Sequence, residues 1–310
     1  MQRNALTALG QLCTAAIDVP LVHLEGMAAE KQAETDARIR LIKKNSDDLA
    51  SDMAIPPEYA RQAVRKFGER IIQEQMNLDQ VGSKAAEQIN LDSEAAETPP
   101  EGSSEVPPIN PDWLNQFEQE ARSVSTEEMQ LMFGRILASE IQKPESFSMK
   151  TVKLVRELDS HTASLFRLFC SCSISLGASQ HLIDVRVPSL GGNAGANSLQ
   201  AHGLSFEQLN LLQENGLIIP DYHTQMDYTL CVARNGSVPV GFTHQNRLWA
   251  LIPDDDRPAD QKMKISGAML TRTGKQLFRV VDIQPRPRYT KALTEFFEKQ
   301  KLKMIVAQQR

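Results

Sequence analysis

The segment from Asn110 to Cys170 constrains the fold most, because closely spaced helix start signals in it are each followed by apolar residues at helical spacing. Asn110 precedes Pro111, which predicts an Asx cap with proline at the first helical position. Ser125 and Glu128 stand three residues apart and predict a capping box at the start of a second helix. The chain therefore begins two helices here within a few turns of each other.

Two further helix starts follow in the same segment. Ser148 predicts the third, and Asp159 or Ser160 predicts the fourth. Four amphipathic helices with connections of a few residues bury their apolar faces by packing antiparallel. We therefore expect a central helical module over residues 111–177.

A set of residues inside this segment forms a signature, which comprises Trp113, Phe117, Glu128, Met129, Arg135 and Phe147. Together with the surrounding residues 110–170, the signature resembles a bacterial family of unknown function that is similar to the abortive-infection alpha proteins. The resemblance implies a role in bacterial cells that fight phage. It supplies no catalytic residues.

The regions on either side of the module differ in composition. Residues 92–110 hold four prolines and five acidic residues with no Lys or Arg, a composition typical of a flexible linker. We expect mainly α structure with a winged-helix-like α+β domain near the C-terminus. The predicted parts are N-terminal amphipathic and charged helices over 1–91, the linker over 92–110, the central module over 111–177, the winged-helix-like domain over 178–285 and a basic helix over 286–310.

Several signals carry the winged-helix expectation. Ser205 predicts a helix that Gly216 ends, and Thr271 predicts another helix start. Asn235 with Gly236 predicts a hairpin. The residues expected to form strands are 184–188, 217–219, 228–233, 238–243, 247–252 and 262–270. A final helix is expected over 289–309.

Two N-terminal segments present apolar residues at helical spacing. One candidate surface for oligomer or membrane contact consists of Leu6, Leu9, Leu12 and Ile17, and a helix buried on the core is the alternative. The other is a stripe that begins after Pro57 and contains Tyr59, Ala63, Val64, Phe67, Ile71 and Met76.

Residue patterns that would indicate catalysis or metal binding are not evident in the sequence. The four cysteines form no C-x-x-C pair, which fits a reducing cytoplasm. Five histidines recur every twenty or twenty-one residues but without the close pairing typical of metal ligands. Asp254 to Asp256 is interpreted as a solvated turn. We therefore expect a cytoplasmic protein that is not an enzyme, with no cofactor and no metal.

The sequence leaves two functions open. The first is a non-enzymatic phage-defence protein that forms a homo-oligomer and binds a protein partner or phage component. The second is a DNA-binding regulator that uses the winged-helix-like part and the basic tail. Its candidate phosphate or acidic-partner contacts are Arg272, Lys275, Arg279, Arg286, Arg288 and Lys291.

Overall fold

The computed structural model describes residues 1–14, 18–19, 22–23, 25–52, 56–95, 106–178, 181–193, 195–234 and 238–307. Predictions that concern Ile17, residues 96–105 of the expected linker and the Asn235–Gly236 turn lie outside these residues. The chain divides into two compact units, Met1–Arg156 and Glu157–Arg310, which are described separately below. The boundary falls inside the 111–177 segment that the sequence predicts as one module.

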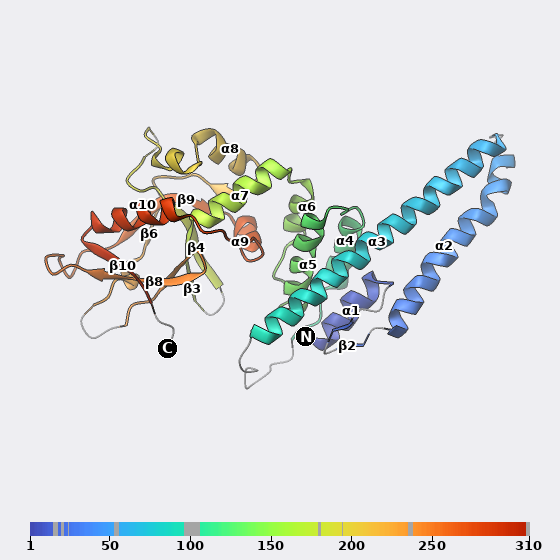
Figure 1. The fold of residues 1–310 in the computed structure, drawn as a ribbon, viewed down its shortest axis with the longest axis horizontal. Helices are drawn as coiled ribbons and strands as arrows, with labels where there is room; N and C mark the ends of the chain where they lie inside the picture. Colours follow the sequence, from blue (N-terminus) through green and yellow to red (C-terminus); the bar gives the residue numbers. More distant parts are fainter. Residues whose placement is uncertain are drawn as a thin grey trace. The chain divides into compact units, whose positions relative to one another are not determined.

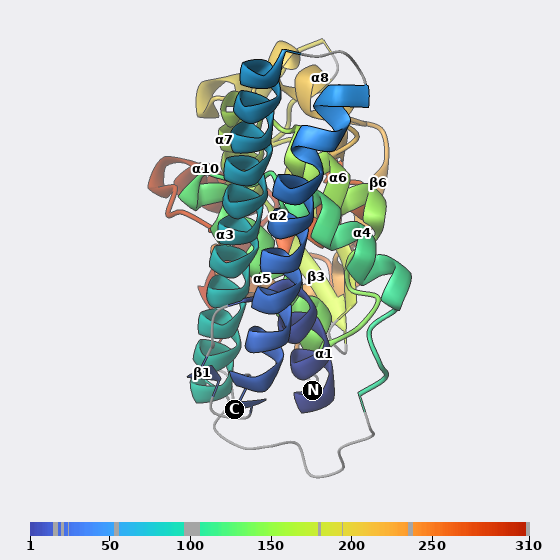
Figure 2. The ribbon, with the colours of Figure 1, turned by 90° about the vertical axis from the view of Figure 1, so that its right-hand side faces the viewer.

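Unit 1 is built from helices and one short two-stranded antiparallel sheet (Figure 1). Its elements are α1 (Gln2–Leu12), β1 (Asp18–Val19), β2 (Val22–His23), α2 (Glu25–Asp52), α3 (Pro57–Ala95), α4 (Pro111–Ala121), α5 (Glu127–Gln142) and α6 (Met149–Glu157). The two longest helices, α2 and α3, lie side by side as a hairpin (Figures 1 and 2). The C-terminal half of α3 packs against α5, and this contact forms the centre of the unit.

The start of α4 forms as the sequence predicts. The Oδ1 atom of Asn110 accepts hydrogen bonds from the backbone N–H of Asp112 at 2.8 Å and of Trp113 at 3.4 Å. The Trp113 ring then stacks on Phe117 at 5.0 Å, and its Nε1 donates to the Phe147 carbonyl at 2.8 Å. This buried indole joins α4 to the turn before α6, so a cap and an aromatic spacing in the sequence set the core of this region.

The predicted capping box at Ser125 is wrong. Helix α5 has Thr126 as its N-cap residue, and no side chain caps it. The later start places Glu127 and Glu128 together in the first turn, where carboxylates interact favourably with the positive end of the helix dipole.

Unit 2 combines helices with a large antiparallel sheet. Its helices are α7 (Ser160–Cys172), α8 (Phe206–Glu214), α9 (Arg272–Phe278) and α10 (Pro287–Glu298), with the 3-10 turns η1 (Ser198–His202) and η2 (Thr229–Cys231). Its strands are β3 (Ile174–Ala178), β4 (His181–Pro188), β5 (Ile218–Ile219), β6 (Gln225–Asp227), β7 (Phe242–His244), β8 (Arg247–Pro253), β9 (Lys264–Leu270) and β10 (Leu302–Val306).

The strand order in this sheet is β10-β8-β7-β3-β4-β9-β5, and β6 also pairs with β9. Helix α10 packs on the sheet through Phe297, whose ring lies 5.9 Å from that of Phe242 in β7. The fold is mixed α+β and rich in helix, as expected. The winged-helix architecture is not confirmed, because the sheet has eight strands in the described part of the unit and joins segments from residue 174 to residue 306.

The local start and stop signals in unit 2 are confirmed. Ser205 and Gln208 form a complete capping box at α8, Gly216 adopts a φ of 67°, and the Thr271 hydroxyl caps α9. These features depend only on residues a few positions apart, which is why the sequence shows them.

Other expected elements in unit 2 are wrong or shorter than predicted. The expected strand 228–233 does not form; the chain makes η2 over Thr229–Cys231 instead, because the Asp227 carboxylate accepts the Thr229 N–H at 2.8 Å and turns the chain. The expected strand 238–243 is reduced to β7. The expected helix 289–309 ends at Glu298, and Lys301 at a φ of 60° leads into β10, which alternates buried Leu302 and Met304 with exposed Lys303.

Candidate functional surfaces

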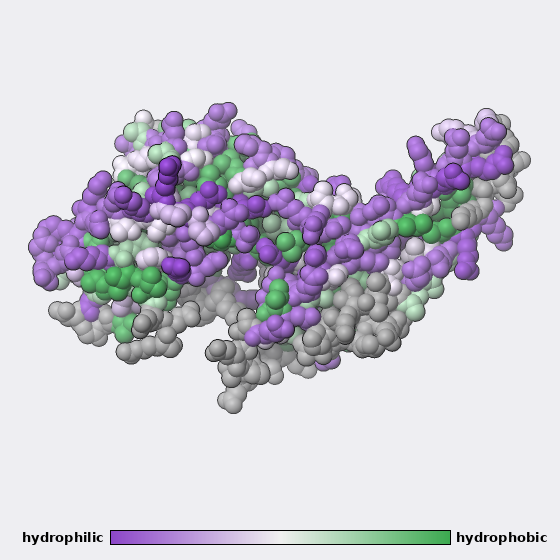
Figure 3. All heavy atoms as spheres, in the orientation of Figure 1, coloured by the Kyte–Doolittle hydropathy of each residue, from purple (hydrophilic) through white to green (hydrophobic). Residues whose placement is uncertain are grey.

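The N-terminal half of α3 carries apolar side chains on its surface. Tyr59, Phe67, Ile72 and Met76 are 66%, 56%, 49% and 53% exposed, respectively. In the C-terminal half of the same helix most apolar side chains are buried, among them Leu78, Val81, Ala85 and Ile89, and Leu91 is the exception at 61% exposed. Figure 3 shows hydrophobic atoms on the surface of the α2–α3 hairpin. Tyr59 and Phe67, eight positions apart, lie on one face of the helix, and exposed apolar residues on one face are typical of a surface that another helix covers.

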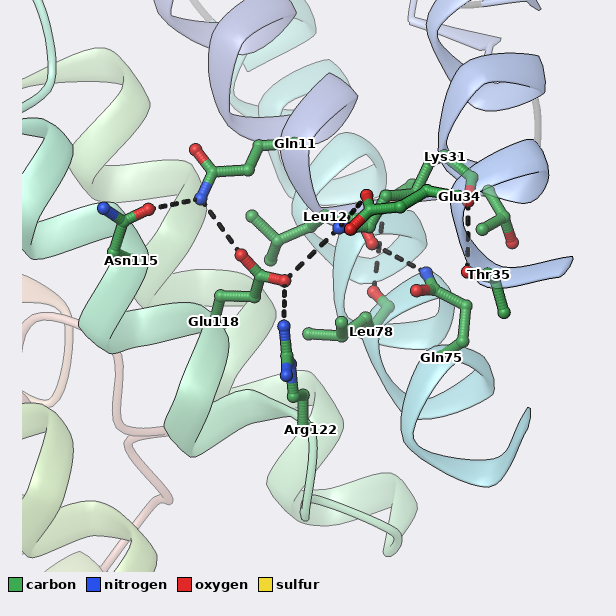
Figure 4. A network of polar contacts seen from close by, with 12 residues as sticks. Gln11, Leu12, Lys31, Glu34, Thr35, Gln75, Leu78, Asn115, Glu118 and Arg122 are labelled. Carbon is green, nitrogen blue, oxygen red and sulfur yellow. Dashed lines mark hydrogen bonds and ion pairs between the residues drawn. The ribbon is translucent and has the colours of Figure 1, made fainter. Parts of the chain in front are cut away.

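A network of polar contacts around Glu118 joins three helices of unit 1 (Figure 4). The carboxylate accepts hydrogen bonds from Arg122 of the next turn at 2.6 Å, from Gln11 of α1 at 3.0 Å and from Lys31 of α2 at 3.4 Å. Burial alone would raise the pKa of Glu118, but the bonds from Arg122 and Gln11 and the charges of Lys31 and Arg122 outweigh it and lower the pKa. The site is therefore a charged junction that holds α1, α2 and α4 together.

Helix α1 is part of the core of unit 1, so the predicted oligomer or membrane contact is wrong for its central residues. Leu9 and Leu12 are fully buried, and Leu6 is only half-exposed. The backbone N–H and the hydroxyl of Thr14 both donate to the Asp79 carboxylate, each at 2.6 Å, and so fix the end of α1 to α3. Among the described residues, no helix combines the length and apolar character needed to cross a bilayer.

The six basic candidates of the C-terminal part fall on two elements of unit 2. Arg272 and Arg279 lie exposed at the ends of α9, and between them the Lys275 Nζ donates to the Ile183 carbonyl at 2.6 Å. This bond ties Lys275 to β4, which leaves it poorly placed to contact phosphate. The nucleic-acid assignment for these residues stays a prediction.

The other three basic candidates begin α10. Arg286 is half-buried at the N-cap position, and its Nε makes no hydrogen bond to the described part of the chain. Arg288 is exposed, and Lys291 pairs with Glu295 at 3.9 Å on the same helix.

A buried ion pair lies in β4, where the sequence predicted no functional residue. Arg186 is 2% exposed and binds both oxygens of Asp184, through Nε at 2.6 Å and Nη2 at 2.9 Å. Its Nη1 donates to the Ile265 carbonyl at 2.7 Å, and the Tyr228 hydroxyl donates to Asp184 at 2.8 Å. Every charged group here has partners, which is typical of a structural rather than a catalytic pair.

Two of the recurring histidines meet at one tyrosine. The rings of His202 and His244 lie 5.2 Å and 6.0 Å from the ring of buried Tyr289. Nδ1 of His244 lies 2.9 Å from the Ser173 carbonyl, which can only accept, so the neutral ring donates from Nδ1 and Nε2 accepts from Thr290 at 3.0 Å. Burial lowers the pKa of His244, which favours this neutral form. Within the described ranges no group of three or more His, Cys, Asp or Glu is placed to hold a metal.

A pocket of about 570 Å³ opens between η2 and the β8–β9 loop of unit 2. Its lining includes Arg234, Asp254, Asp255, Arg257 and Gln261 beside apolar residues. Arg257 is 8% exposed, and its Nη2 is buried without a hydrogen bond to any described residue. The sequence predicted a solvated turn at Asp254 to Asp256 and gave no signal at Arg257, because the partners of this loop come from residues near 233 and 300.

The signature residues of the central segment lie partly in the core and partly at the surface of unit 1. Trp113, Phe117 and Phe147 are buried, whereas Met129 and Arg135 are half-buried and Glu128 is exposed. The buried members of the signature thus have a structural role in the core of unit 1.

No curated protein and no solved structure matches the chain. A family model described as a protein of unknown function, DUF2806, matches residues 61–294. The match covers most of both units and confirms the expected unknown-function family, while the likeness to abortive-infection alpha proteins stays a prediction. The chain thus belongs to the DUF2806 family.

Proposed function

We propose that this protein is a non-enzymatic phage-defence protein of the abortive-infection type that acts by self-association through α3. The observation that supports self-association is the apolar strip formed by Tyr59, Ala63 and Phe67. The resemblance of residues 110–170 supports the role in defence.

The strip consists of residues four positions apart, which lie on one ridge of a helix. Tyr59 and Phe67 are more than half exposed, and Ala63 between them is half-buried. Large rings thus stand at both ends of the strip, with a small side chain at its centre.

A two-fold contact between two identical copies requires a surface that is complementary to itself, and this strip meets that requirement because a small side chain lies between two rings. If two copies of α3 cross at Ala63 about a two-fold axis, Tyr59 of each copy faces Phe67 of the other. The small side chain at the crossing lets the helices approach, and the rings can pack in the offset or edge-to-face geometry that aromatic pairs favour. Because the strip is complementary to itself in this way, we assign it to a second copy.

Light scattering of the purified protein as a function of concentration tests the self-association. We expect the mass to rise above the 34.6 kDa of one chain. Tyr59→Glu with Phe67→Glu should hold the mass at 34.6 kDa, because two carboxylates from each copy would be buried in the contact. The matched control, Gln62→Glu with Gln80→Glu, adds the same charge at exposed positions of α3 and should behave as the wild type. A wild-type protein that stays monomeric at every concentration would refute self-association.

The position of the crossing can be tested with Ala63→Cys. At a two-fold axis this thiol meets its own copy and should form a disulfide on mild oxidation, provided that the two Cα atoms approach within about 7 Å. Gln62→Cys, one position away on the helix, should cross-link far less. The native cysteines Cys13, Cys170, Cys172 and Cys231 are buried and should not compete.

The biological part of the proposal needs a separate measurement. Expression in a bacterial host should lower the efficiency of plaque formation by a phage that the protein recognises. The Tyr59→Glu/Phe67→Glu variant should restore plaque formation, whereas the Gln62→Glu/Gln80→Glu control should not. Protection by the double variant equal to that by the wild type would separate the defence role from the α3 strip.

A further inference from the structure

Helix α4 packs against one side of the α2–α3 hairpin, far from the connection between these two helices. On α2, the Lys31 Nζ donates to the Glu118 carboxylate of α4 at 3.4 Å (Figure 4). On α3, the Asn77 side-chain amide donates to the carbonyl of Arg122, the C-cap residue of α4, at 2.7 Å. Lys31 and Asn77 therefore mark the side of the hairpin that faces α4.

The same side of the hairpin is apolar and exposed nearer the connection. Successive residues of an α-helix point about 100° apart, so Tyr59, eighteen residues before Asn77, points in the same direction as Asn77. On α2, Leu41 comes ten residues after Lys31 and lies within about 80° of its direction. Tyr59 is 66% exposed and Leu41 is 61% exposed. Both helices thus present an apolar residue on the side that α4 covers farther down.

Leu41 and Phe67 lie at the same level of the hairpin. Helix α2 ends at Asp52 and α3 begins at Pro57. Leu41 comes eleven residues before the end of α2, and Phe67 comes ten residues after the start of α3. Because the two helices run side by side in opposite directions, equal counts from the connection give equal levels. Leu41 and Phe67 therefore flank the groove between α2 and α3.

We infer that α2 takes part in the self-association, so that the α2–α3 hairpins of two copies pack as a four-helix bundle. This inference rests on the proposed contact between two copies of α3. A two-fold axis at Ala63 brings Tyr59 of one copy to the level of Phe67 of the other, which is also the level of Leu41. The Tyr59 ring then lies in the groove of the other copy, between Phe67 and Leu41. In this arrangement α3 of the second copy covers the part of the hairpin side that α4 leaves exposed.

Dilution of the full-length protein, followed by light scattering, tests the part that α2 plays. Leu41→Glu should raise the concentration of half-association at least about tenfold, because each copy would bury a carboxylate beside the Tyr59 ring. Gln32→Glu is the matched control. It adds the same charge at an exposed position nine residues before Leu41, on the opposite side of α2, and should leave half-association unchanged. The same concentration of half-association in Leu41→Glu and the wild type would overturn the inference.

A disulfide tests the predicted neighbours directly, in the variant Leu41→Cys with Tyr59→Cys. Within one chain the two positions differ in level by nine residues, or about 13 Å, which is beyond the limit of about 7 Å between the Cα atoms of a disulfide. Mild oxidation should therefore join two chains and give a covalent dimer on a non-reducing gel. Gln32→Cys with Tyr59→Cys should give far less of it, because Gln32 faces away from the groove.

The cross-link of Ala63→Cys distinguishes a failure of this inference from a failure of the proposed function. If Ala63→Cys cross-links but Leu41→Cys with Tyr59→Cys does not, the α3 contact stands and the role of α2 is refuted. If neither variant cross-links, the α3 contact fails and the inference fails with it. Leu41 and Tyr59 are both more than half exposed, so these substitutions leave the core of unit 1 unchanged.

Discussion

At the scale of single residues, the polar groups buried in each unit connect distant parts of the chain. Glu118 receives bonds from residues 107 and 87 positions away, and Arg186 donates to a carbonyl 79 positions away. Sequence patterns report on neighbours within a few residues, whereas these partners meet only after the fold has formed. The sequence therefore predicted the caps at Asn110, Ser205 and Thr271 but not these buried groups.

The ion pair in β4 leads to a prediction about stability. Arg186→Met should lower the free energy of unfolding of unit 2 by about 3–5 kcal/mol, because Asp184 remains buried without its cation. Urea unfolding, followed by circular dichroism, measures the change. Lys291→Met removes an exposed pair with Glu295 and should leave unfolding almost unchanged. Similar effects of the two substitutions would contradict the structural role of Arg186.

The lowered pKa of Glu118 predicts a dependence of stability on pH. A carboxyl whose pKa is lower in the folded than in the unfolded state stabilises the fold above the unfolded value, here 4.5, and loses this contribution as pH falls through the folded value. Glu118→Gln should therefore be less stable than the wild type at pH 7. The difference in stability between the two proteins should become smaller below pH 4.5. Thermal unfolding at several pH values measures this difference in stability, with Glu69→Gln, at an exposed position away from the ends of α3, as the control. A difference in stability between Glu118→Gln and the wild type that stays the same at every pH would exclude a stabilising effect of the Glu118 charge.

At the scale of elements, α3 behaves differently in its two halves. The sequence predicted an apolar stripe only over residues 59–76, in the N-terminal half, and did not single out the buried apolar residues of the C-terminal half. Which half is covered depends on where α5 packs, and that depends on the tertiary fold. For the same reason the sequence misassigned residues 302–306 to a helix, because β10 exists only through its pairing with β8.

Two glycines test this difference between the halves. A Cβ at Gly134 of α5 would come within 2.6 Å of the Lys84 Cβ on α3, whereas a Cβ at Gly68 would meet nothing within 4 Å. Gly134→Ala should therefore destabilise unit 1 by about 1–3 kcal/mol by forcing α3 and α5 apart. Gly68→Ala should stabilise it by about 0.5–1 kcal/mol, since alanine favours an open helix position. Chemical denaturation should show changes in the free energy of unfolding that have opposite signs for the two variants. Changes of the same sign would contradict the close packing at Gly134.

At the scale of the whole molecule, the chain contains two cores. Unit 1 buries the apolar faces of α1, α3, α4 and α5, and unit 2 buries the sheet beneath α10. The sequence predicted the change from helical to mixed structure near residue 177. It could not place the boundary near residue 157, because α7 carries the same helical signals as the helices before it while its buried face belongs to unit 2.

Two cores predict two independently folding fragments. A cut after Glu157 leaves α6 complete on one side and keeps Asp159, whose carboxylate caps α7 at 2.8 Å, on the other. Fragments 1–157 and 158–310 should each show a single cooperative thermal transition by circular dichroism, since each retains its core. Fragment 158–300 is the informative control. It lacks β10, so the β8 edge loses its partner and the buried Leu302 and Met304, and the transition should shift to lower temperature. A fragment 158–310 without a cooperative transition would mean that α7 and the sheet need unit 1 in order to fold.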